Sequence, residues 1–269
     1  MAAEPTRVIL AGATGWAGSA LARGLAAQAD LQLVAAVSRG AAGKRLGAVL
    51  GDDRLTAPVF ASAQEALAHK ADVFVEYTKP DRAKANILAA LAAGCHVVVG
   101  TSGLTDADYA EIDVAARAAQ RGVLACGNFA LTAVLLMKFG EIAAKYFDHF
   151  ELIDYAHEDK ADVPSGTVRE FAARLARVRE AAQPVPLDRV RGPAEARGAR
   201  VGAVQVHALR LPGYVLGFEA IFGAAGQRLH LKHESGASAE LYVDGALLAI
   251  RRVHTLIGVH RGLDTVMDL

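Results

Sequence analysis

Short apolar runs alternate with helical stretches through the first half of the chain. The runs lie at residues 7–11, 31–37, 72–77, 96–100 and 123–126. Apolar positions at helical spacing are found between them, at 80–93 and 106–120. Strands that are apolar at every position are typical of a parallel sheet covered by helices on both faces. The pattern therefore predicts an α/β fold with a Rossmann-type, doubly wound parallel sheet.

The second half of the chain has a different pattern, which indicates an α+β domain. Its predicted elements are helices at 131–146 and 168–178 and strands at 150–155, 201–211, 215–222 and 228–233. Strands joined by short turns such as GAAGQ should form a mixed or antiparallel sheet. Residues 180–200 carry prolines, arginines and glycines without periodicity, so we expect a mobile connection or lid there.

Two domains are expected from the length and from this change of pattern. The chain has 269 residues, and a typical domain has roughly 100–200. We predict a dinucleotide-binding domain at residues 1–128 and a substrate-binding and oligomerisation domain at 129–238. Residues 239–255 are apolar at helical spacing. A C-terminal helix within 239–269 should therefore return to pack on the first domain.

A glycine-rich loop follows the first predicted strand and precedes a helical stretch. It reads GATGWAG, and Gly12, Gly15 and Gly18 have a spacing that permits a tight turn and close approach to a pyrophosphate. A glycine pattern alone also fits a purely structural turn. Its place between a strand and a helix favours a dinucleotide site. Further candidate contacts in this loop are Thr14, Trp16 and Ala17.

The end of the second predicted strand bears on the choice of coenzyme. Ser38 and Arg39 stand where NAD-selective folds usually place Asp or Glu to hold the ribose hydroxyls. An arginine beside a small hydroxyl residue suits a 2′-phosphate, so NADPH is predicted as the preferred coenzyme and NADH as the second. The alternative interpretation is that Arg39 is a solvated surface residue.

Three more loops follow predicted strands at their carboxyl ends, where ligands bind in open α/β sheets. GTSGLT offers backbone N–H groups and hydroxyls to the nicotinamide end of a dinucleotide, and a plain turn is the alternative. CGNFAL follows the last strand of the first domain and is a candidate hinge. The candidate cofactor contacts in these loops are Tyr77, Thr78, Gly100, Thr101, Ser102, Gly127, Asn128 and Phe129.

The most informative motif is DYAHEDKADVPSGT, at residues 154–167. Its Ser-Gly-Thr turn opens a helix, and unpaired N–H groups with the positive end of the helix dipole favour a carboxylate or phosphate there. A histidine and a lysine just ahead of the turn strengthen this interpretation. The candidate substrate contacts are His157, Lys160, Ser165, Gly166 and Thr167.

The same turn also has a purely structural interpretation. Thr167 followed by Glu170 fits a capping box, which predicts helix from Val168 onward. On this interpretation the turn caps a helix and binds nothing. Both interpretations predict a helix here. Only the anion-binding interpretation gives the preceding histidine and lysine a role in binding.

Composition narrows the choice of ligand and location. The chain has 29 basic and 29 acidic residues and no run of Lys or Arg, so we expect neither a nucleic-acid nor a membrane partner. Cys95 and Cys126 lie in apolar segments, which argues against a disulfide scaffold, and no metal site is expected. No apolar run reaches the roughly 18 residues of a membrane helix. A small ligand and a cytoplasmic location are expected.

Together these motifs resemble the 4-hydroxy-tetrahydrodipicolinate reductases, formerly dihydrodipicolinate reductases, of lysine and diaminopimelate biosynthesis. GATGWAG is similar to the family's glycine loop, GTSGLT to its GTTG loop, CGNFAL to its PNFS segment, and KADVPSGT to its KxDxPSGT motif. The resemblance spans nearly the whole chain. It implies that Lys160 and the SGT turn grip the carboxylates of a small anionic cyclic imine. It also implies an RxG element at Arg210 and Gly213 and a homotetramer.

The chain departs from the family where the proton donor is expected. The family usually reads ExHHxxK, whereas this chain reads DYAHEDK. Ala156 thus stands at the proposed proton donor, and His157 matches the second histidine. The candidates for the proton are His157, Tyr155, Lys160 and a bound water, and histidine has the most suitable intrinsic acidity. The glycine loop also lacks the Arg-Met pair common in the family, so this is a divergent member.

Three hypotheses for the function remain open. The first is an NADPH-dependent reductase of dihydrodipicolinate, with hydride transfer to a conjugated cyclic imine and with His157 and Lys160 as catalytic residues. The second is an imine reductase or amino-acid dehydrogenase on another substrate, because Ala156 would open space beside Tyr155. The third is a protein that binds NADP and has lost catalysis. Turnover of dihydrodipicolinate separates the first from the others.

Overall fold

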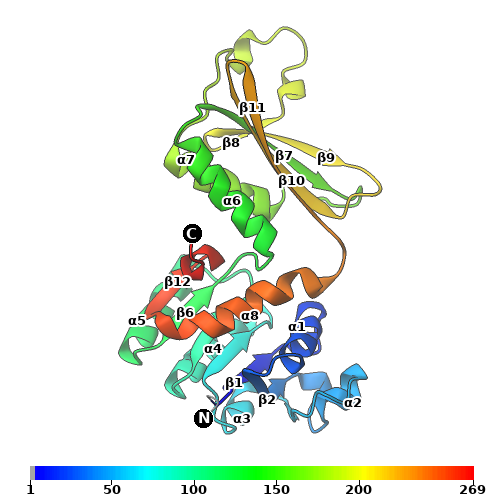
Figure 1. Cartoon of the computed structure of the whole chain (residues 1–269), viewed down its shortest axis with the longest axis vertical. Coiled ribbons are helices and arrows are strands. Elements are labelled where there is room, and N and C mark those ends of the chain that lie inside the picture. The colour runs from blue at the N-terminus through cyan, green and yellow to red at the C-terminus, as the bar shows by residue number, and fades with distance from the viewer. Residues whose placement is uncertain (1–3) are drawn as a thin grey trace. The chain divides into compact units, whose positions relative to one another are not determined.

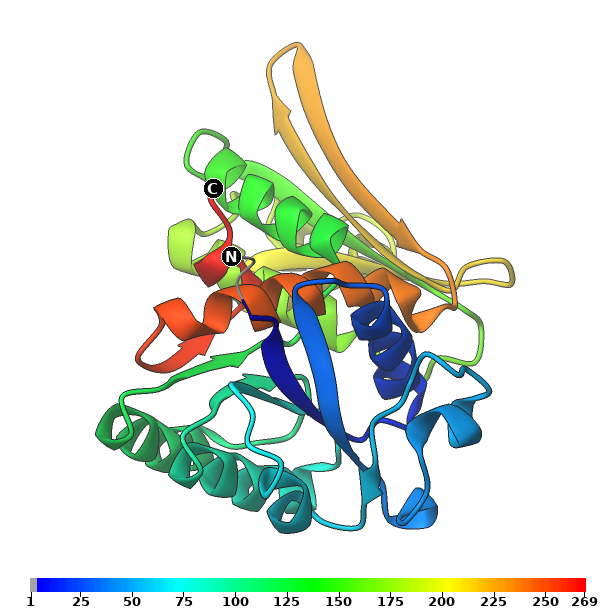
Figure 2. The same cartoon turned by 60° about the horizontal axis from the view of Figure 1, so that its bottom comes forward.

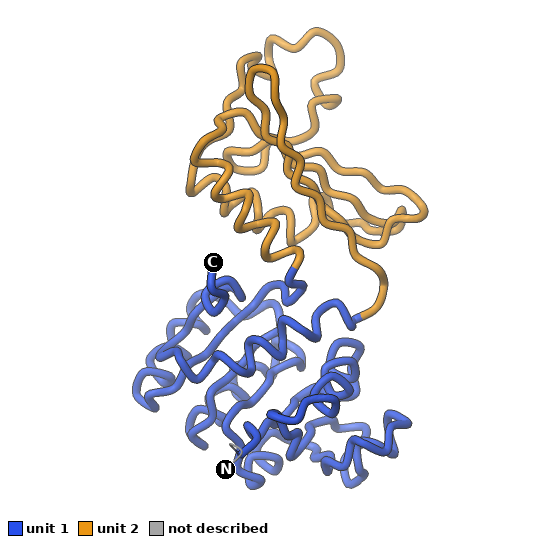
Figure 3. Tube along the Cα trace, in the orientation of Figure 1, with its two compact units in different colours: residues 1–131, 239–269 blue, residues 132–238 orange. Residues whose placement is uncertain are grey.

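The computed structural model describes residues 4–269, which form two compact units. Figure 1 and Figure 2 show the elements from two directions, and Figure 3 colours the units. The first unit comprises the chain up to residue 131 together with residues 239–269, and the second comprises residues 132–238. The predicted first domain starts at residue 1, so its first three residues lie outside the described part of the chain.

The first unit contains a seven-stranded sheet in the order β12-β6-β5-β4-β1-β2-β3. Every strand pairing in it is parallel. The strands are β1 (Thr6–Ala11), β2 (Leu31–Val37), β3 (Val59–Phe60), β4 (Val73–Glu76), β5 (His96–Val99), β6 (Gly122–Ala125) and β12 (Gly258–Arg261). The strand order reverses between β1 and β4. That reversal is the switch point beside which open α/β sheets bind their ligands.

Helices cover both faces of this sheet (Figure 2), which explains why its strands are mostly apolar. The helices of the unit are α1 (Trp16–Ala26), α2 (Leu46–Leu50), α3 (Ala63–Leu67), α4 (Pro80–Ala92), α5 (Asp106–Ala118) and α8 (Val243–Arg252). α3, α4 and α5 pack on one face over a core that includes Ile9, Phe74, Ile87 and Ile112. α1 and α8 contact each other on the opposite face (Figure 2). The predicted doubly wound parallel sheet is confirmed.

Local sequence determines where several of these helices begin. Pro80 lies in the first turn of α4, where its missing N–H group costs nothing. Thr105 and Asp108 form a capping box on α5: the hydroxyl accepts from the Asp108 N–H at 3.1 Å, and the carboxylate accepts from the Thr105 N–H at 2.9 Å. Ser62 caps α3 by accepting from the Glu65 N–H. These local interactions determine the residues at which α3, α4 and α5 begin.

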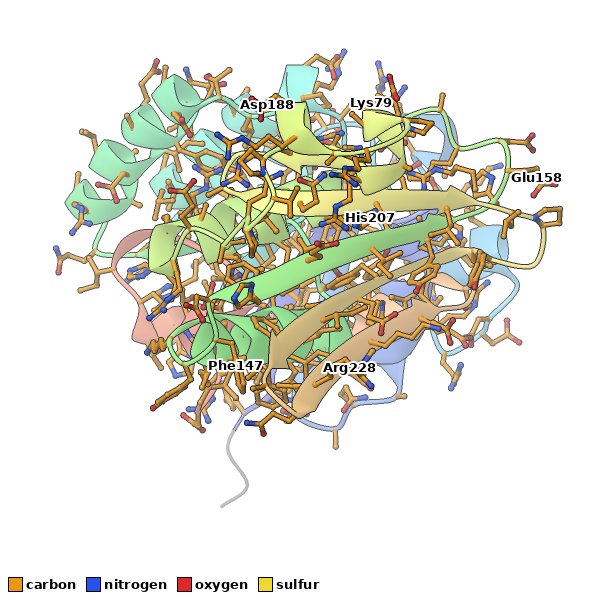
Figure 4. The ribbon with its side chains drawn as sticks, turned by 90° about the horizontal axis from the view of Figure 1, so that it is seen from above. Lys79, Phe147, Glu158, Asp188, His207 and Arg228 are labelled. Atoms are coloured by element: carbon orange, nitrogen blue, oxygen red, sulfur yellow. The ribbon has the colours of Figure 1, made fainter. Side chains whose placement is uncertain are left out.

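The second unit contains a five-stranded mixed sheet in the order β11-β10-β7-β9-β8. Its strands are β7 (His149–Ala156), β8 (Ala199–Val201), β9 (Val204–Arg210), β10 (Leu216–Ala224) and β11 (Gln227–Ser235). β7 and β9 run parallel and the other pairs are antiparallel. Helices α6 (Leu131–Ala144) and α7 (Gly166–Val178) pack on one face, where Phe171 meets Phe218 edge-on. Figure 4 looks onto the other face, where His207 lies.

The segment at 180–200 has more structure than its composition suggested. It contains two 3₁₀ turns, Leu187–Arg189 and Ala194–Arg197. The guanidinium of Arg197 pairs with Glu151 on β7, which ties the segment to the sheet. Turns of three or four residues leave no periodic signal in a sequence, so composition alone could not reveal them.

The C-terminal segment corrects the prediction of a single helix. A 3₁₀ turn (Ala239–Tyr242) precedes α8, and another (Val253–Thr255) follows it. The chain then forms β12, which pairs with β6 at the edge of the first sheet, and a final 3₁₀ turn (Leu263–Val266). Sequence analysis missed β12 because the four-residue run GVHR carries no distinctive strand pattern. The two-residue strand β3 and the short helices α2 and α3 escaped notice for the same reason.

Three general features concern membrane spans, cysteines and metal-binding side chains. No helix within residues 4–269 combines the length and the apolar character that a bilayer span requires. Cys95 and Cys126 are both buried and are not joined by a disulfide bond. Across the same residues, no three metal-binding side chains lie close enough together to hold an ion.

Candidate functional site

The glycine loop between β1 and α1 is tight, and the helix start behind it is open. A Cβ atom on Gly12 would lie 2.3 Å from the carbonyl oxygen of Tyr77, and one on Gly18 would lie 2.1 Å from the carbonyl oxygen of Gly12. Only glycine fits at these two positions. α1 begins after Gly15 without a side-chain cap. The N–H groups of its first turn therefore face outward with the positive end of the helix dipole and fit a pyrophosphate.

Two hydroxyl groups join this loop to the end of β2, beside an unpaired arginine. The Oγ1 atom of Thr14 lies 2.7 Å from the Oγ atom of Ser38. Arg39 follows as the exposed first residue of a 3₁₀ turn (Arg39–Ala41). Within residues 4–269 its guanidinium has no hydrogen-bond or ion-pair partner. An arginine in this place can form a bidentate contact to a phosphate.

Trp16 opens α1 and gives the loop an aromatic surface in place of a positive charge. Its side chain is 61% exposed. The indole meets the ring of Tyr242 edge-on, with the ring centroids 5.8 Å apart. Trp16 is also the one tryptophan of the chain. Its emission therefore reports on whatever binds at this loop.

The ring of Tyr77 is packed between the loops that follow β4, β5 and β6. Its centroid lies 5.7 Å from that of Phe129, and a Cβ atom on Gly100 would lie 2.4 Å from the Tyr77 ring. The Tyr77 hydroxyl is buried and has no hydrogen-bond partner in the described chain. Burial also raises the pKa of Tyr77. An orphaned buried hydroxyl is costly, so this site fits a ligand that brings a polar group.

The other predicted cofactor contacts divide into buried and exposed groups. Thr101 is 8% exposed, and its hydroxyl lies 3.1 Å from the carbonyl oxygen of Thr78, so it faces inward. Ser102 and Gly127 are exposed at the loop tips. Asn128 accepts a hydrogen bond from the N–H of Ala130 at 2.8 Å, which shapes the turn after β6. Thr101 therefore supports the structure of its loop, whereas Ser102 and Gly127 are accessible to a ligand.

In the second unit, the loop after β7 is built around the buried carboxylate of Asp154, which is 1% exposed. It accepts from the backbone N–H and from the hydroxyl of Ser165, both at 2.8 Å. It also accepts from the Nη2 atom of Arg210 at 2.7 Å. The Ser165 oxygen in turn accepts from the N–H of Val168 at 3.3 Å and so caps α7. Asp154 thus holds the serine that starts the helix.

The predicted capping box of Thr167 and Glu170 is therefore wrong. α7 begins at Gly166 with Ser165 as its cap, so Thr167 lies inside the first turn. Sequence analysis missed this because the aspartate that holds Ser165 lies eleven residues earlier. Since the Ser165 N–H and hydroxyl are used by Asp154, the open donors of the turn are the N–H groups of Gly166 and Thr167. No acceptor within the described residues takes them. They remain suited to an anion.

Lys160 and its loop are held by Asp162 and Arg210. Its Nζ atom lies 2.6 Å from Oδ1 of Asp162, and its side chain is 22% exposed. The ammonium group lowers the pKa of Asp162. Arg210 donates to the carbonyl oxygens of Lys160 at 3.2 Å and of Asp162 at 2.8 Å, which fixes the path of the loop. A substrate carboxylate would compete with Asp162 for the lysine.

The residues around the expected proton donor lie in different environments. His157 is exposed just beyond the end of β7. Ala156 is 0% exposed, so its small side chain opens no space within this unit, contrary to expectation. Tyr155 points to the opposite side of the strand from Asp154, and its hydroxyl donates to Glu219 at 2.7 Å. Burial and this carboxylate raise the pKa of Tyr155. That leaves His157 and Lys160 as the side chains available at the loop.

A cavity of about 740 Å³ lies elsewhere in the second unit. It is bordered by β7, β10 and the segment at 180–200, and Phe150, Arg189, Arg191 and Ile221 are among the residues that line it. None of the predicted site residues lines this cavity.

Comparison with known proteins assigns both units to one family. Residues 6–129 match the model described as dihydrodipicolinate reductase, N-terminus, and residues 132–267 match that described as dihydrodipicolinate reductase, C-terminus. The chain belongs to the dihydrodipicolinate reductase family. The two matched segments meet where the chain passes from the first unit to the second. The resemblance seen in the sequence motifs is thereby confirmed.

Individual relatives match over almost their whole length. The 4-hydroxy-tetrahydrodipicolinate reductase of Desulfitobacterium hafniense (strain DSM 10664 / DCB-2) is 34% identical over 269 residues, covering 97% of this chain and 98% of that protein. That of Thermosynechococcus vestitus is 36% identical over 269 residues, covering 98% of this chain and 97% of that protein. The family is therefore represented from end to end in this chain.

Solved structures give the same result. The dipicolinate-bound dihydrodipicolinate reductase of Paenisporosarcina sp. TG-14 superposes with a TM-score of 0.86 at 28% identity, covering 98% of this chain and all of that one. An amine dehydrogenase from Mycobacterium smegmatis, at 17% identity and a TM-score of 0.63, shares the fold alone. The two-domain architecture therefore also occurs outside the family. The family assignment depends on the relatives with higher sequence identity.

Several residues that shape the site could not be identified as such from the sequence. Asp154 and Glu76 are buried; Glu76 is the one charged residue of β4, whereas β7 carries Glu151 besides Asp154. An acidic residue in an otherwise apolar strand, as in β4, is itself a signal, because a buried charge must have partners. Arg210 was named from the resemblance, but its contacts with Asp154 show how it acts. Asp162 stands at the aspartate of the KxDxPSGT motif, but the motif alone did not indicate that it pairs with Lys160.

Proposed function

We propose that this chain is an NAD(P)H-dependent reductase of dihydrodipicolinate, the dehydrated form of 4-hydroxy-tetrahydrodipicolinate, in lysine and diaminopimelate biosynthesis. The observation that carries the proposal is the open N–H pair of Gly166 and Thr167 at the end of the loop that carries Lys160, in a member of the dihydrodipicolinate reductase family. This arrangement suits a ligand with carboxylate groups. Dihydrodipicolinate is a cyclic imine with two carboxylates.

The first unit is proposed to bind the dinucleotide and the second to bind the substrate. The open first turn of α1 would hold the pyrophosphate, and Arg39 would hold the 2′-phosphate, which favours NADPH over NADH. Trp16 and the exposed loop residues after β5 and β6 would border the rest of the coenzyme. The reduced nicotinamide, when bound, supplies the hydride. Replacing Arg39 with Ala should weaken NADPH binding and leave NADH binding nearly unchanged.

The chain's own residues account for the rest of the proposed chemistry. Lys160 and the start of α7 hold the substrate carboxylates and place positive charge near the ring that accepts electrons. His157 is proposed to supply the proton for the other end of the double bond, since histidine exchanges protons near neutral pH. A positioned acid typically contributes about 10²–10⁴-fold to a rate. With Ala156 at the family's usual donor position, the reaction should be slower and still present.

We also infer a cytoplasmic homotetramer. The buried, unbridged cysteines suit a reducing compartment. The face of the second sheet opposite α6 and α7 carries the half-buried apolar side chains of Ile153 on β7 and Ile221 on β10. Light scattering should therefore give four times the 28.1 kDa mass of one chain. A mass of one or two chains would contradict the tetramer.

The experiment that tests this function is oxidation of NADPH in the presence of freshly generated dihydrodipicolinate. The substrate is made in the same vessel from pyruvate and aspartate semialdehyde by the preceding synthase, and omission of pyruvate gives the control. Turnover that depends on pyruvate supports the proposal. Turnover of other cyclic imines alone would indicate an imine reductase. NADPH binding without any turnover would indicate a non-catalytic protein.

A further inference from the structure

Glu76 is a fully buried acidic residue at the carboxyl end of β4, with 0% of its surface exposed. β4 lies between β1 and β5, so Glu76 sits at the switch point of the sheet. Its carbonyl oxygen accepts from the N–H of Gly100 at 3.0 Å, which joins it to the loop after β5. Burying a carboxyl group without partners costs several kcal/mol. The cost of burying Glu76 must therefore be offset by hydrogen-bond partners.

Donors from three segments surround its carboxyl group. The Oε1 atom accepts from the backbone N–H of Thr78 at 2.7 Å and also from the Thr78 hydroxyl. The hydroxyl of Thr101 lies 3.4 Å from the same oxygen. The Oε2 atom accepts from the side-chain amide of Asn86 at 2.8 Å. One carboxyl group thus ties the loop after β4, helix α4 and the loop after β5 together.

The donors around Glu76 suit a carboxyl group, because both of its oxygens accept hydrogen bonds. Burial raises the pKa of Glu76, while hydrogen bonds from Thr78 and Asn86 act in the opposite direction. The backbone N–H of Thr78 can only donate, so it needs an acceptor at Oε1. A glutamine in place of Glu76 would bring an NH₂ group among these donors. An apolar residue would leave two polar groups buried without partners.

We propose that Glu76 is a positioning residue for the nicotinamide end of the coenzyme. Through Thr78 and Thr101 it sets the relative placement of the loops after β4 and β5. In open α/β sheets the dinucleotide crosses the switch point, so these loops border the end that carries the hydride. The inference rests on the proposed function to the extent that it assumes a bound dinucleotide.

Separate residues hold the other end of the coenzyme. The glycine loop and Arg39 lie on the β1 and β2 side of the switch point. Loss of Glu76 should therefore change the affinity for NADPH little and disturb the orientation of the nicotinamide. Since a displacement of about 1 Å can slow a reaction roughly 100-fold, hydride transfer should fall at least about tenfold.

The test compares Glu76→Gln with a matched control, Asp113→Asn. Asp113 lies on α5 in the same unit and accepts from the backbone N–H of Val259 at 2.7 Å, at the start of β12. Both variants convert a carboxylate that holds a backbone N–H into an amide. Three quantities are measured: the Kd of NADPH from quenching of Trp16 emission, the emission of the bound nicotinamide, and kcat.

For Glu76→Gln we expect a Kd within about threefold of wild type, altered nicotinamide emission and the fall in kcat given above. Asp113→Asn should match wild type in all three. Glu76→Asp, which keeps the carboxylate, should recover part of kcat. A kcat and an emission equal to wild type for Glu76→Gln would overturn the proposal. So would parallel losses of affinity, kcat and melting temperature, which would indicate a general structural role.

A second variant covers the case in which Glu76→Gln does not fold. Thr101→Val keeps the shape of the side chain and removes only the hydroxyl near Glu76. It should show the same split between Kd and kcat in a milder form, and wild-type behaviour would overturn the proposal. Nicotinamide emission needs no imine. A wild-type chain that is inert toward dihydrodipicolinate would therefore defeat the proposed function without deciding the role of Glu76.

Discussion

Asp154 and Arg210 form an ion pair beneath the loop that carries Lys160. The carboxylate is 1% exposed and the arginine side chain 15%. Arg210 also donates to two carbonyl oxygens of the loop, so one guanidinium holds both the charge and the backbone path. Buried pairs of this kind add little net stability, but removing one partner is costly because it leaves the other charge buried alone. The pair therefore fixes the geometry of the proposed substrate loop.

Replacing Arg210 with Met should lower the free energy of unfolding by about 3–5 kcal/mol, because Asp154 would be left buried without a cation. Urea denaturation measures this directly. Arg228→Met is the matched control, since Arg228 is exposed on β11 in the same unit (Figure 4). Equal stability of the two variants would contradict the structural role given to Arg210.

Replacing Lys160 with Ala should raise KM for dihydrodipicolinate and lower kcat/KM by roughly 10- to 100-fold, the value of one charged hydrogen bond. Steady-state kinetics at saturating NADPH measure it. Lys145→Ala, an exposed lysine at the end of α6, is the control and should behave as wild type. If Lys160→Ala kept wild-type kinetics, the substrate site would have to lie elsewhere.

At this scale the sequence predicted residues that stand together in one motif and missed those that meet across the fold. Lys160 and Ser165 could be identified because their spacing is local. The contact of Asp154 with Arg210 joins positions 56 residues apart. The sequence around either residue does not indicate that the two meet. The short range of the pattern likewise led to Thr167 as the helix cap in place of Ser165.

Secondary-structure elements were predictable in proportion to their length and periodicity. β1, β2, α4 and α5 have clear patterns, and their observed bounds lie close to the predicted ones. β3 and β12 are short and lie at the two edges of the sheet, where pairing with a neighbour decides their conformation. Helix starts depend on single caps, and α5 shows how one acidic side chain determines such a start.

The cap on α5 predicts a pH dependence of stability. Hydrogen bonds from Thr105, with help from Lys84, lower the pKa of Asp108 from its ordinary 3.8 to about 2. A carboxyl group with a lowered pKa in the folded state stabilises the fold above its unfolded pKa, and this contribution is lost as the pH falls through the folded pKa. The melting temperature of Asp108→Asn should therefore lie below that of wild type near neutral pH. The difference should shrink between about pH 4 and pH 2.

Asp106→Asn is the control for this measurement. Asp106 is the first residue of the same helix, and its side chain is 92% exposed and pairs with Arg261 at the surface. Exposed pairs contribute little, so this variant should stay close to wild type at every pH. A melting-temperature difference for Asp108→Asn that does not change with pH would show that the carboxylate charge is not what stabilises the cap.

On the scale of the whole molecule, each unit combines parts that the sequence keeps far apart. The first unit takes β12 and α8 from residues 239–269 to complete a sheet begun by β1. Sequence patterns predicted its fold class, since that follows from alternating strands and helices. They could not predict that the last strand pairs with β6, because long-range pairing leaves no local mark. The family assignment covers both units, which supports a single reductase function for the chain.

The most direct test of that function is the fate of the hydride. NADPH carrying deuterium at one face of nicotinamide C4 is incubated with the wild-type chain and freshly generated dihydrodipicolinate, and the product is analysed by mass spectrometry. We predict tetrahydrodipicolinate one mass unit heavier from one of the two labelled faces, in an amount equal to the NADPH consumed. NADPH that binds while neither labelled face yields deuterated product would contradict the assignment.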